Sequence, residues 1–237
     1  MFKKVTYVLV FVLTTLVLFS GCDDDSTIVS SSDLVDGSRL FGFSDGRVFN
    51  YIQTDTLTTV DPFLITITEI HQVVRISGDG DDWVIWDNNT PLVNLKITAN
   101  DIIQNGYWRE VDGYDSLFYF AAPPVVVPRR LAVGTPWDDY TPHFVTESEQ
   151  VMLPFCCANF GFYFTRELVG IEEVLTPYGA FNAHRFDVSL YVAQSDEEPI
   201  ATSVEYFAPD VGLVKLNFSS GPLQRSLAIV SYSDAVN

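Results

Sequence analysis

The chain has 237 residues, of which 31 are acidic and only 13 are basic, and its formal net charge at pH 7 is −18. Hydrophobic residues make up 47% of the sequence, which is enough to bury one sizeable core. The charge argues against a nucleic-acid partner, because phosphate binding needs a basic patch and the nearest basic cluster is the pair Arg129–Arg130.

The first 21 residues have the three zones of a secretory signal peptide. Lys3 and Lys4 form the basic start, an apolar run follows from residue 5 to residue 19, and two small residues come at positions 20 and 21. The apolar run is shorter than the roughly 20 residues that a spanning helix needs. We therefore predict a signal that is cleaved, not a permanent transmembrane helix.

The segment Phe19-Ser20-Gly21-Cys22 resembles the lipobox of bacterial lipoproteins, with Phe where an aliphatic residue is usual. The resemblance implies that the signal is removed before Cys22 and that acyl chains on this cysteine hold the protein on a membrane. It also implies a location on the cell membrane or the outer membrane, facing the periplasm or the cell exterior. A plain cleaved signal and a free cysteine are the alternatives.

A polar stretch follows the cysteine and begins with three aspartates at positions 23–25. It holds too few apolar side chains for a core, so we predict a flexible acidic tether over residues 22–40 and one domain over residues 41–237. Aspartate directly after a lipidated cysteine resembles an inner-membrane retention signal of enteric bacteria. An acidic run there also resembles a surface-export signal of Bacteroidota-like lipoproteins, and the sequence does not distinguish the two.

Short runs of β-branched and aromatic residues recur about every ten positions from residue 41 onward. They predict an all-β (or β-rich α+β) fold with a single antiparallel sheet system, either an open half-barrel or a sandwich. Tight turns are expected at residues 78–82 and at Asp112–Gly113, and a final strand near residues 226–232. A short helix is expected around Thr98 to Gln104.

A proline-rich passage, AAPPVVVPRR, divides the chain at residues 121–130. Its prolines at positions 123, 124 and 128 cannot donate to a sheet ladder, which predicts an edge strand or an extended crossover. We expect this crossover to connect two halves of one domain; a linker between two domains is the alternative.

Three segments after the crossover resemble a group of bacterial secreted and lipoprotein β-domains: LAVGTPW (131–137), VLTPYGAFNAHRFDV (174–188) and YFAPDVGLVKLNF (206–218). These domains are similar to the half-closed barrels of the lipoprotein-carrier class. The resemblance spans residues 115–232 and implies an incomplete barrel with a concave apolar face, without an established enzymatic activity. We expect Trp137, Phe186 and Val214 to line a ligand groove in that face.

Alternation after Gly179 predicts a strand with two different faces. His184, Phe186, Val188 and Leu190 should share one face, with the polar side chains of residues 185, 187 and 189 on the other.

Signals for catalysis and metal binding are weak. The three histidines at positions 71, 143 and 184 lack the spacing of a zinc site. The acidic run at residues 77–82 lacks the remaining ligand positions of a calcium loop and fits a solvated hairpin tip. We therefore predict no catalytic residue, no metal and no other cofactor.

The adjacent Cys156 and Cys157 have three interpretations. They form a vicinal disulfide, they are two thiols on opposite faces of a strand, or they take part in an intermolecular bridge or a redox reaction.

Two function classes follow from the sequence. The first is a lipid-anchored cell-envelope lipoprotein whose non-catalytic β-domain binds an apolar ligand or an envelope protein. The second is a hydrolase of an extracellular polymer that uses carboxylates as acid and base.

Overall fold

The computed structural model describes residues 34–60, 63–111, 114–120, 123–134, 136–141, 162–192 and 198–234. Thirteen strands in these ranges form one antiparallel sheet, two further strands form a separate pair, and one 3-10 helix is present. The predicted all-β class with a single antiparallel sheet system is confirmed. The elements are, in chain order, β1 Val35–Asp36, η2 Gly37–Phe41, β2 Arg47–Val60, β3 Phe63–Asp79, β4 Asp82–Asp87, β5 Thr90–Ile97, β6 Asp101–Val111, β7 Tyr114–Tyr119, β8 Val125–Pro128, β9 Arg130–Leu131, β10 Pro136–Thr141, β11 Phe162–Leu175, β12 Ala180–Val192, β13 Ala201–Ala208, β14 Gly212–Ser220 and β15 Leu223–Ser233.

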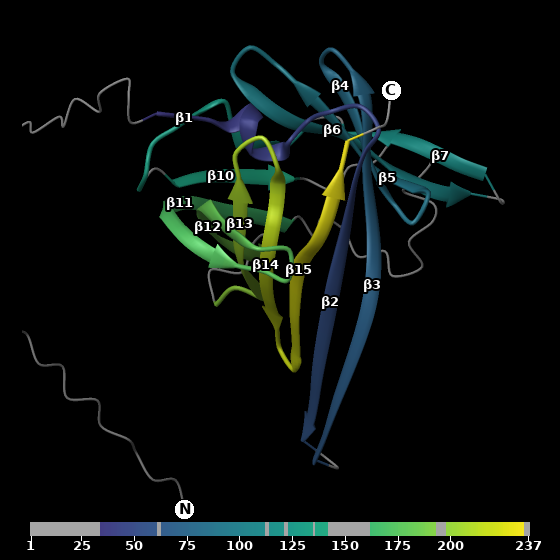
Figure 1. The fold of residues 1–237 in the computed structure, drawn as a ribbon, viewed down its shortest axis with the longest axis vertical. Helices are drawn as coiled ribbons and strands as arrows, with labels where there is room; N and C mark the ends of the chain where they lie inside the picture. Colours follow the sequence, from purple (N-terminus) through teal and green to yellow (C-terminus); the bar gives the residue numbers. More distant parts are fainter. Residues whose placement is uncertain are drawn as a thin grey trace, which may run out of the picture.

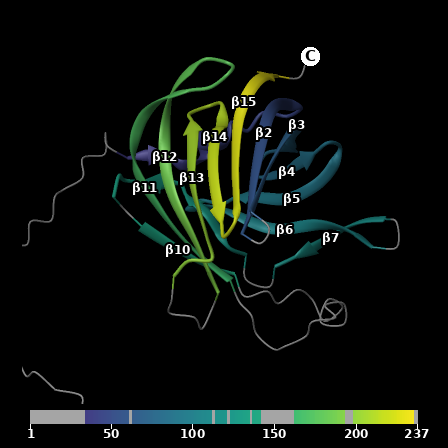
Figure 2. The ribbon, with the colours of Figure 1, turned by 90° about the horizontal axis from the view of Figure 1, so that it is seen from below.

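The sheet has two halves, β2 to β7 and β10 to β15, and within each half the strands follow one another in chain order. Its order is β10-β11-β12-β13-β14-β15-β2-β3-β4-β5-β6-β7, with β8 attached to β6. The last strand, β15, pairs with β2, so that Leu227 lies opposite Gln53 and Ile229 lies opposite Tyr51. The sheet curls around an interior (Figure 2). No described strand connects β7 to β10, so in this part of the chain the curl stays open.

Two predicted hairpins are present. Asp79 lies opposite Asp82 at the β3–β4 turn, where Gly80 has a φ of 59°. Val111 lies opposite Tyr114 where β6 continues into β7. The predicted C-terminal strand is β15.

The short helix expected around Thr98 to Gln104 is wrong. Residues 98–100 connect two strands, and Asp101 begins β6. The Thr98 hydroxyl accepts a hydrogen bond from the Asp101 backbone N–H at 2.9 Å, which favours a turn over a helix. The β-branched Ile102 that follows is fully buried as a strand residue.

The proline-rich crossover is extended where the structure describes it. Val125–Pro128 form β8, which pairs antiparallel with the start of β6 and places Val127 opposite Ile102. Pro128 ends the strand, a position where its missing N–H is tolerated.

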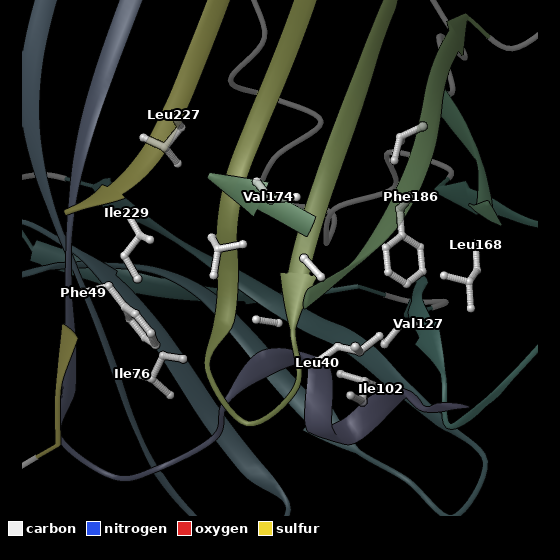
Figure 3. Close-up of a cluster of buried hydrophobic side chains, with 14 of the residues drawn as sticks. Leu40, Phe49, Ile76, Ile102, Val127, Leu168, Val174, Phe186, Leu227 and Ile229 are labelled. Atoms are coloured by element: carbon white, nitrogen blue, oxygen red, sulfur yellow. The ribbon is translucent and has the colours of Figure 1, made fainter. Parts of the chain in front are cut away.

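Alternation along β12 builds one wall of the core, as predicted. His184, Phe186 and Val188 are buried. On the opposite face, the Arg185 guanidinium pairs with the Asp187 carboxylate at 2.9 Å. Figure 3 shows Phe186 beside Leu168 of β11, in the same buried cluster as Leu40 and Val127.

The segment before residue 41 belongs to the folded domain, which corrects the predicted tether boundary at residue 40. Val35 pairs with Leu131, and Leu40 in η2 is only 1% exposed. The Asp36 carboxylate accepts a hydrogen bond from the Ser38 N–H at 2.9 Å and caps η2. Sequence composition underestimated this segment because one deeply buried leucine is enough to dock a single helical turn.

Glycine is required where η2 ends. Gly42 has a φ of 57°, and a β-carbon there would lie 2.1 Å from the Val211 carbonyl oxygen. On the same side, the Asp210 backbone N–H donates to the Arg39 carbonyl oxygen at 2.7 Å. The turn between β13 and β14 therefore packs directly against η2.

The β2–β3 hairpin is much longer than its neighbours. It extends beyond the rest of the sheet in Figure 1. β2 continues along β15 as far as Leu57, which lies opposite Leu223, whereas β3 pairs with β4 only from Val74 onward.

Candidate functional site

The candidate site is a cavity of about 190 Å³ on the inside of the curled sheet. We call it the inner cavity. It is lined by Leu40, Phe41, Val126, Val127, Arg166, Phe186, Glu205 and Phe207.

The inner cavity lies between the two halves of the sheet. Leu40 and Phe41 come from η2, and Val126 and Val127 from β8, which belongs to the N-terminal half through β6. The other lining residues come from β11, β12 and β13, three neighbouring strands of the C-terminal half. The cavity exists only because the sheet curls far enough to bring these parts together.

A row of aromatic rings crosses the interior at the cavity. Phe186 meets Phe207 edge-on at 5.6 Å between ring centroids, and Phe207 contacts Phe41 at 5.5 Å. Phe41 stacks on Phe43 at 5.4 Å, and Phe43 contacts Trp83 at 5.0 Å. Ring pairs at these separations attract each other beyond simple burial, so the row stabilises the contact between η2 and both halves of the sheet.

Two charged side chains interrupt the apolar lining. Glu205 lies opposite Phe186 in the β12–β13 ladder and accepts a hydrogen bond from the Ser203 hydroxyl at 3.0 Å. Arg166 lies in β11, opposite Val188. An apolar ligand would bind among the rings, and these two groups would determine which polar end it can carry.

His184 is the buried ionisable residue next to this site. It lies opposite Phe207, is 6% exposed, and its Nδ1 atom has no hydrogen-bond partner among the described residues. Desolvation lowers the pKa of His184 below its usual value, and a hydrogen bond with the Phe207 backbone opposes that shift only in part. His184 is therefore a neutral member of the core at pH 7.

Several aspartates of the described part of the chain are held as ionised partners of arginines. Arg225 donates two hydrogen bonds to Asp55, at 2.7 and 2.8 Å, and these hold the pKa of the Asp55 carboxyl below its usual range. A hydrogen bond from Arg47 likewise lowers the pKa of Asp234. These shifts are opposite to the raised pKa that a general acid needs near neutral pH.

A second hollow, of about 430 Å³, lies over β2, β13, β14 and β15. Its lining is mostly hydroxyl and amide side chains: Thr54, Thr56, Thr202, Ser203, Val204, Asn217, Phe218, Ser219, Gln224, Arg225 and Ser226. Water satisfies such groups well, so this hollow has a weaker drive to take up a ligand than the inner cavity has.

The structure describes the side chains of two of the three residues that were expected to line a groove. Phe186 lines the inner cavity. Val214 is fully buried in the core and is not part of the lining. Trp137 lies in β10 opposite Arg166, but its side chain lies outside the described residues, as do Cys22, Cys156 and Cys157.

Sequence reasoning did not find the other lining residues. Leu40 and Phe41 fell in or beside the predicted tether, and Val126 and Val127 were assigned to a crossover. The alternation Ser203, Glu205, Phe207 in β13 was a usable signal, because these residues pair with His184, Phe186 and Val188 and lie on the same face of the sheet.

The described residues contain neither a cluster of metal-ligating side chains nor a long apolar helix. No three histidine, cysteine, aspartate or glutamate side chains in these ranges gather as a metal site requires. None of the helical structure in the same ranges is long and apolar enough to span a membrane.

Comparison with family models and with curated proteins found no match. Among solved structures, the chain is similar to a proposed exported protein with a YmcC-like fold from Bacteroides fragilis NCTC 9343. The TM-score is 0.36 and the identity 16%, over 82% of this chain and 98% of the other. It is also similar to a proposed lipoprotein from Parabacteroides distasonis ATCC 8503, with TM-score 0.37, identity 13% and coverage of 82% and 98%. A third similar structure is the hypothetical lipoprotein YmcC from Escherichia coli K12, with TM-score 0.33, identity 9% and coverage of 79% and 86%.

Proposed function

We propose that this protein is a lipid-anchored envelope lipoprotein whose β-domain binds an apolar group in the inner cavity without catalysing a reaction. The observation that carries the proposal is the cavity itself, a space between two halves of a sheet that is lined by three phenylalanine rings and three aliphatic side chains.

The size of the inner cavity limits what it can hold. Its volume of about 190 Å³ is below the range of about 300–1,000 Å³ that is typical of sites for drug-sized molecules. It is slightly larger than an engineered apolar cavity of about 150 Å³ that binds benzene. The occupant is therefore one ring or a short alkyl segment, such as the end of an acyl chain or an apolar side chain of an envelope protein.

The proposed anchor is close to the site along the chain. Cys22 precedes the first described residue, Leu34, by 12 positions, and η2 follows directly after β1. At 3.3–3.6 Å per residue, such a segment spans at most roughly 40 Å. A lipid on Cys22 would therefore keep the cavity within reach of the membrane surface.

Binding is tested with toluene and 1-octanol as neutral probes of ring and alkyl shape, by calorimetric titration of the full chain in a non-denaturing buffer. Val126→Phe fills the cavity and should weaken binding at least tenfold. The matched control, Val133→Phe, changes an exposed valine outside the lining and should leave the affinity unchanged. If Val126→Phe does not fold, Val126→Ala replaces it and should admit a bulkier ring such as naphthalene.

The absence of binding by the wild-type protein to either probe would overturn the cavity as the site. Turnover of an envelope polysaccharide that is lost in Glu205→Gln would instead make the protein a carboxylate-dependent hydrolase.

The lipid anchor is tested separately. Mass spectrometry of the N-terminal peptide should find Cys22 acylated, and Cys22→Ser should release the protein from the membrane fraction. An unmodified Cys22 in the mature chain would contradict the anchor without affecting the cavity.

A further inference from the structure

The long β2–β3 hairpin leaves one side of β3 without a strand partner in the described part of the chain. β3 pairs with β2 from Phe63 to Ile76, but β4 covers its other side only between Val74 and Asp79. The free edge therefore runs from Phe63 to Gln72, because Asn88 already bonds the backbone of Val73.

The free edge is apolar on both faces. Phe63, Ile65 and Ile67 alternate on one face and are 71%, 51% and 67% exposed. Leu64 and Ile70 are exposed on the other face, which continues into the core at Val74 and Ile76. Burial of these side chains against a partner would remove a large apolar surface from water.

The backbone groups that point away from β2 can be identified from Val73. Its carbonyl oxygen accepts a hydrogen bond from the Asn88 N–H at 2.8 Å, and its own N–H donates to the Asn88 Oδ1 atom. Because the direction of these groups alternates along a strand, Phe63, Ile65, Ile67, Glu69 and His71 also direct their N–H and C=O groups toward the free edge.

The sequence of this edge has few of the features that usually prevent pairing, and Glu69 is its one carboxylate. Residues 63–72 read FLITITEIHQ, without lysine, arginine or proline. Insertion of the edge into a membrane would leave its N–H and C=O groups unsatisfied in hydrocarbon, at a cost of several kcal/mol each. The partner that the edge fits is another strand.

We infer that the partner is the same edge of a second copy of this chain, paired antiparallel about a two-fold axis at Ile67. In this arrangement Ile67 lies opposite Ile67, Thr66 opposite Thr68, and Leu64 opposite Ile70 of the other copy. Apolar residues meet at Ile67 and between Leu64 and Ile70, and threonine meets threonine, which are favourable cross-strand pairs. At the ends of the paired region, Ile65 meets Glu69 and Phe63 meets His71.

Neighbouring registers fit less well. A shift by two positions in one direction places Thr66 opposite Ile70 and Leu64 opposite Gln72. A shift by two more positions in that direction places Glu69 opposite Glu69 of the other copy, and like charges directly opposite each other are destabilising. A shift in the other direction shortens the paired region and places Leu64 opposite Thr68. Shifts by one position are excluded because the outward-pointing groups would no longer match.

The register also fits around β4. Phe63 of one copy reaches only as far as His71 of the other, so β3 of the second copy begins before the segment that β4 already covers. The hairpin extends away from the rest of its sheet (Figure 1), which allows the two bodies to lie at opposite ends of the paired region. The two sheets become one continuous sheet through about ten new backbone hydrogen bonds, two for each of five facing pairs.

The test uses the full chain in detergent that is matched to the solvent density, with its mass measured by sedimentation equilibrium. Wild type should sediment as a dimer. Ile67→Lys and Ile67→Glu should each halve the mass, because equal charges would meet at the two-fold axis, and an equimolar mixture of the two variants should restore the dimer. Thr56→Lys is the matched control, since Thr56 lies opposite Ile67 on β2, away from the free edge, and it should remain dimeric.

Hydrogen exchange gives an independent result. The backbone amides of Ile65, Ile67 and Glu69 should be protected in the wild-type dimer and exchange quickly in Ile67→Lys. A monomeric wild type would overturn the inference, and so would a dimer that Ile67→Lys leaves intact or a mixture of the charged variants that stays monomeric. Protection of these amides in a monomer would show that another part of the same chain covers the edge, which also overturns it.

Discussion

Replacement of Leu168 by alanine tests whether β11 contributes one face to the core. Leu168 is fully buried and lies opposite Phe186, beside the inner cavity, and Figure 3 shows the two side chains next to each other. Its carbonyl oxygen accepts a hydrogen bond from the Gly134 N–H at 2.8 Å, and that backbone contact survives the substitution. The change therefore removes only packing.

The expected loss is large. Truncation of a buried leucine to alanine costs about 3–5 kcal/mol, and a site with full burial belongs in that range. With a urea dependence of roughly 2 kcal/mol per molar, the unfolding midpoint should fall by about 1.5–2.5 M. This would remove a considerable part of the roughly 5–15 kcal/mol that stabilises a domain.

Leu175→Ala is the control, because Leu175 lies on the same strand and is 72% exposed. Its effect on the free energy of unfolding should stay within about 0.5 kcal/mol. Both variants are measured by equilibrium urea unfolding, followed by tryptophan fluorescence and circular dichroism. Equal losses in the two variants, or a loss below about 1 kcal/mol for Leu168→Ala, would refute the assignment of the buried face of β11.

Three further predictions concern charged residues and cysteines. A double-mutant cycle with Asp55→Asn and Arg225→Gln should give a coupling free energy of about 1 kcal/mol, as befits a two-bond pair that is partly exposed. Because the pKa of Asp55 is lowered from 3.8, this coupling should be present above pH 3.8 and disappear as the pH falls further; a coupling of zero at pH 7 would contradict the pair. The pKa of His184 is lowered from 6.5, so the unfolded chain takes up the proton first and the free energy of unfolding should fall below pH 6.5, by at most about 1.4 kcal/mol per pH unit. His184→Gln should flatten this dependence, and an unchanged slope would count against it. In the chain with Cys22 acylated, thiol titration of the denatured, unreduced protein should find zero free thiols if Cys156 and Cys157 are bridged to each other and two if both are free. A count of one would contradict both the vicinal disulfide and the two free thiols.

Local chemistry was enough to predict many of the strands and turns. The alternation of His184, Phe186 and Val188 with polar residues identified both faces of β12, because successive strand side chains point to opposite sides. Gly80 allowed the β3–β4 hairpin to be recognised, since it tolerates the positive φ of a tight turn. The expected helix near Thr98 failed because the threonine hydroxyl bonds to the backbone locally.

Taken alone, the sequence determined the signal-like start, the β class, the single antiparallel sheet system and the alternation within strands, all of which depend on residues close together in the chain. Only the tertiary structure decided that β15 pairs with β2, that η2 packs inside the curl, and that Leu40, Phe41 and Phe207 gather around one cavity. It also decided that β3 extends past β4 and presents a free apolar edge. These features depend on how far the sheet twists and curls and on which distant strands meet, and no periodicity within a short window of sequence encodes that geometry.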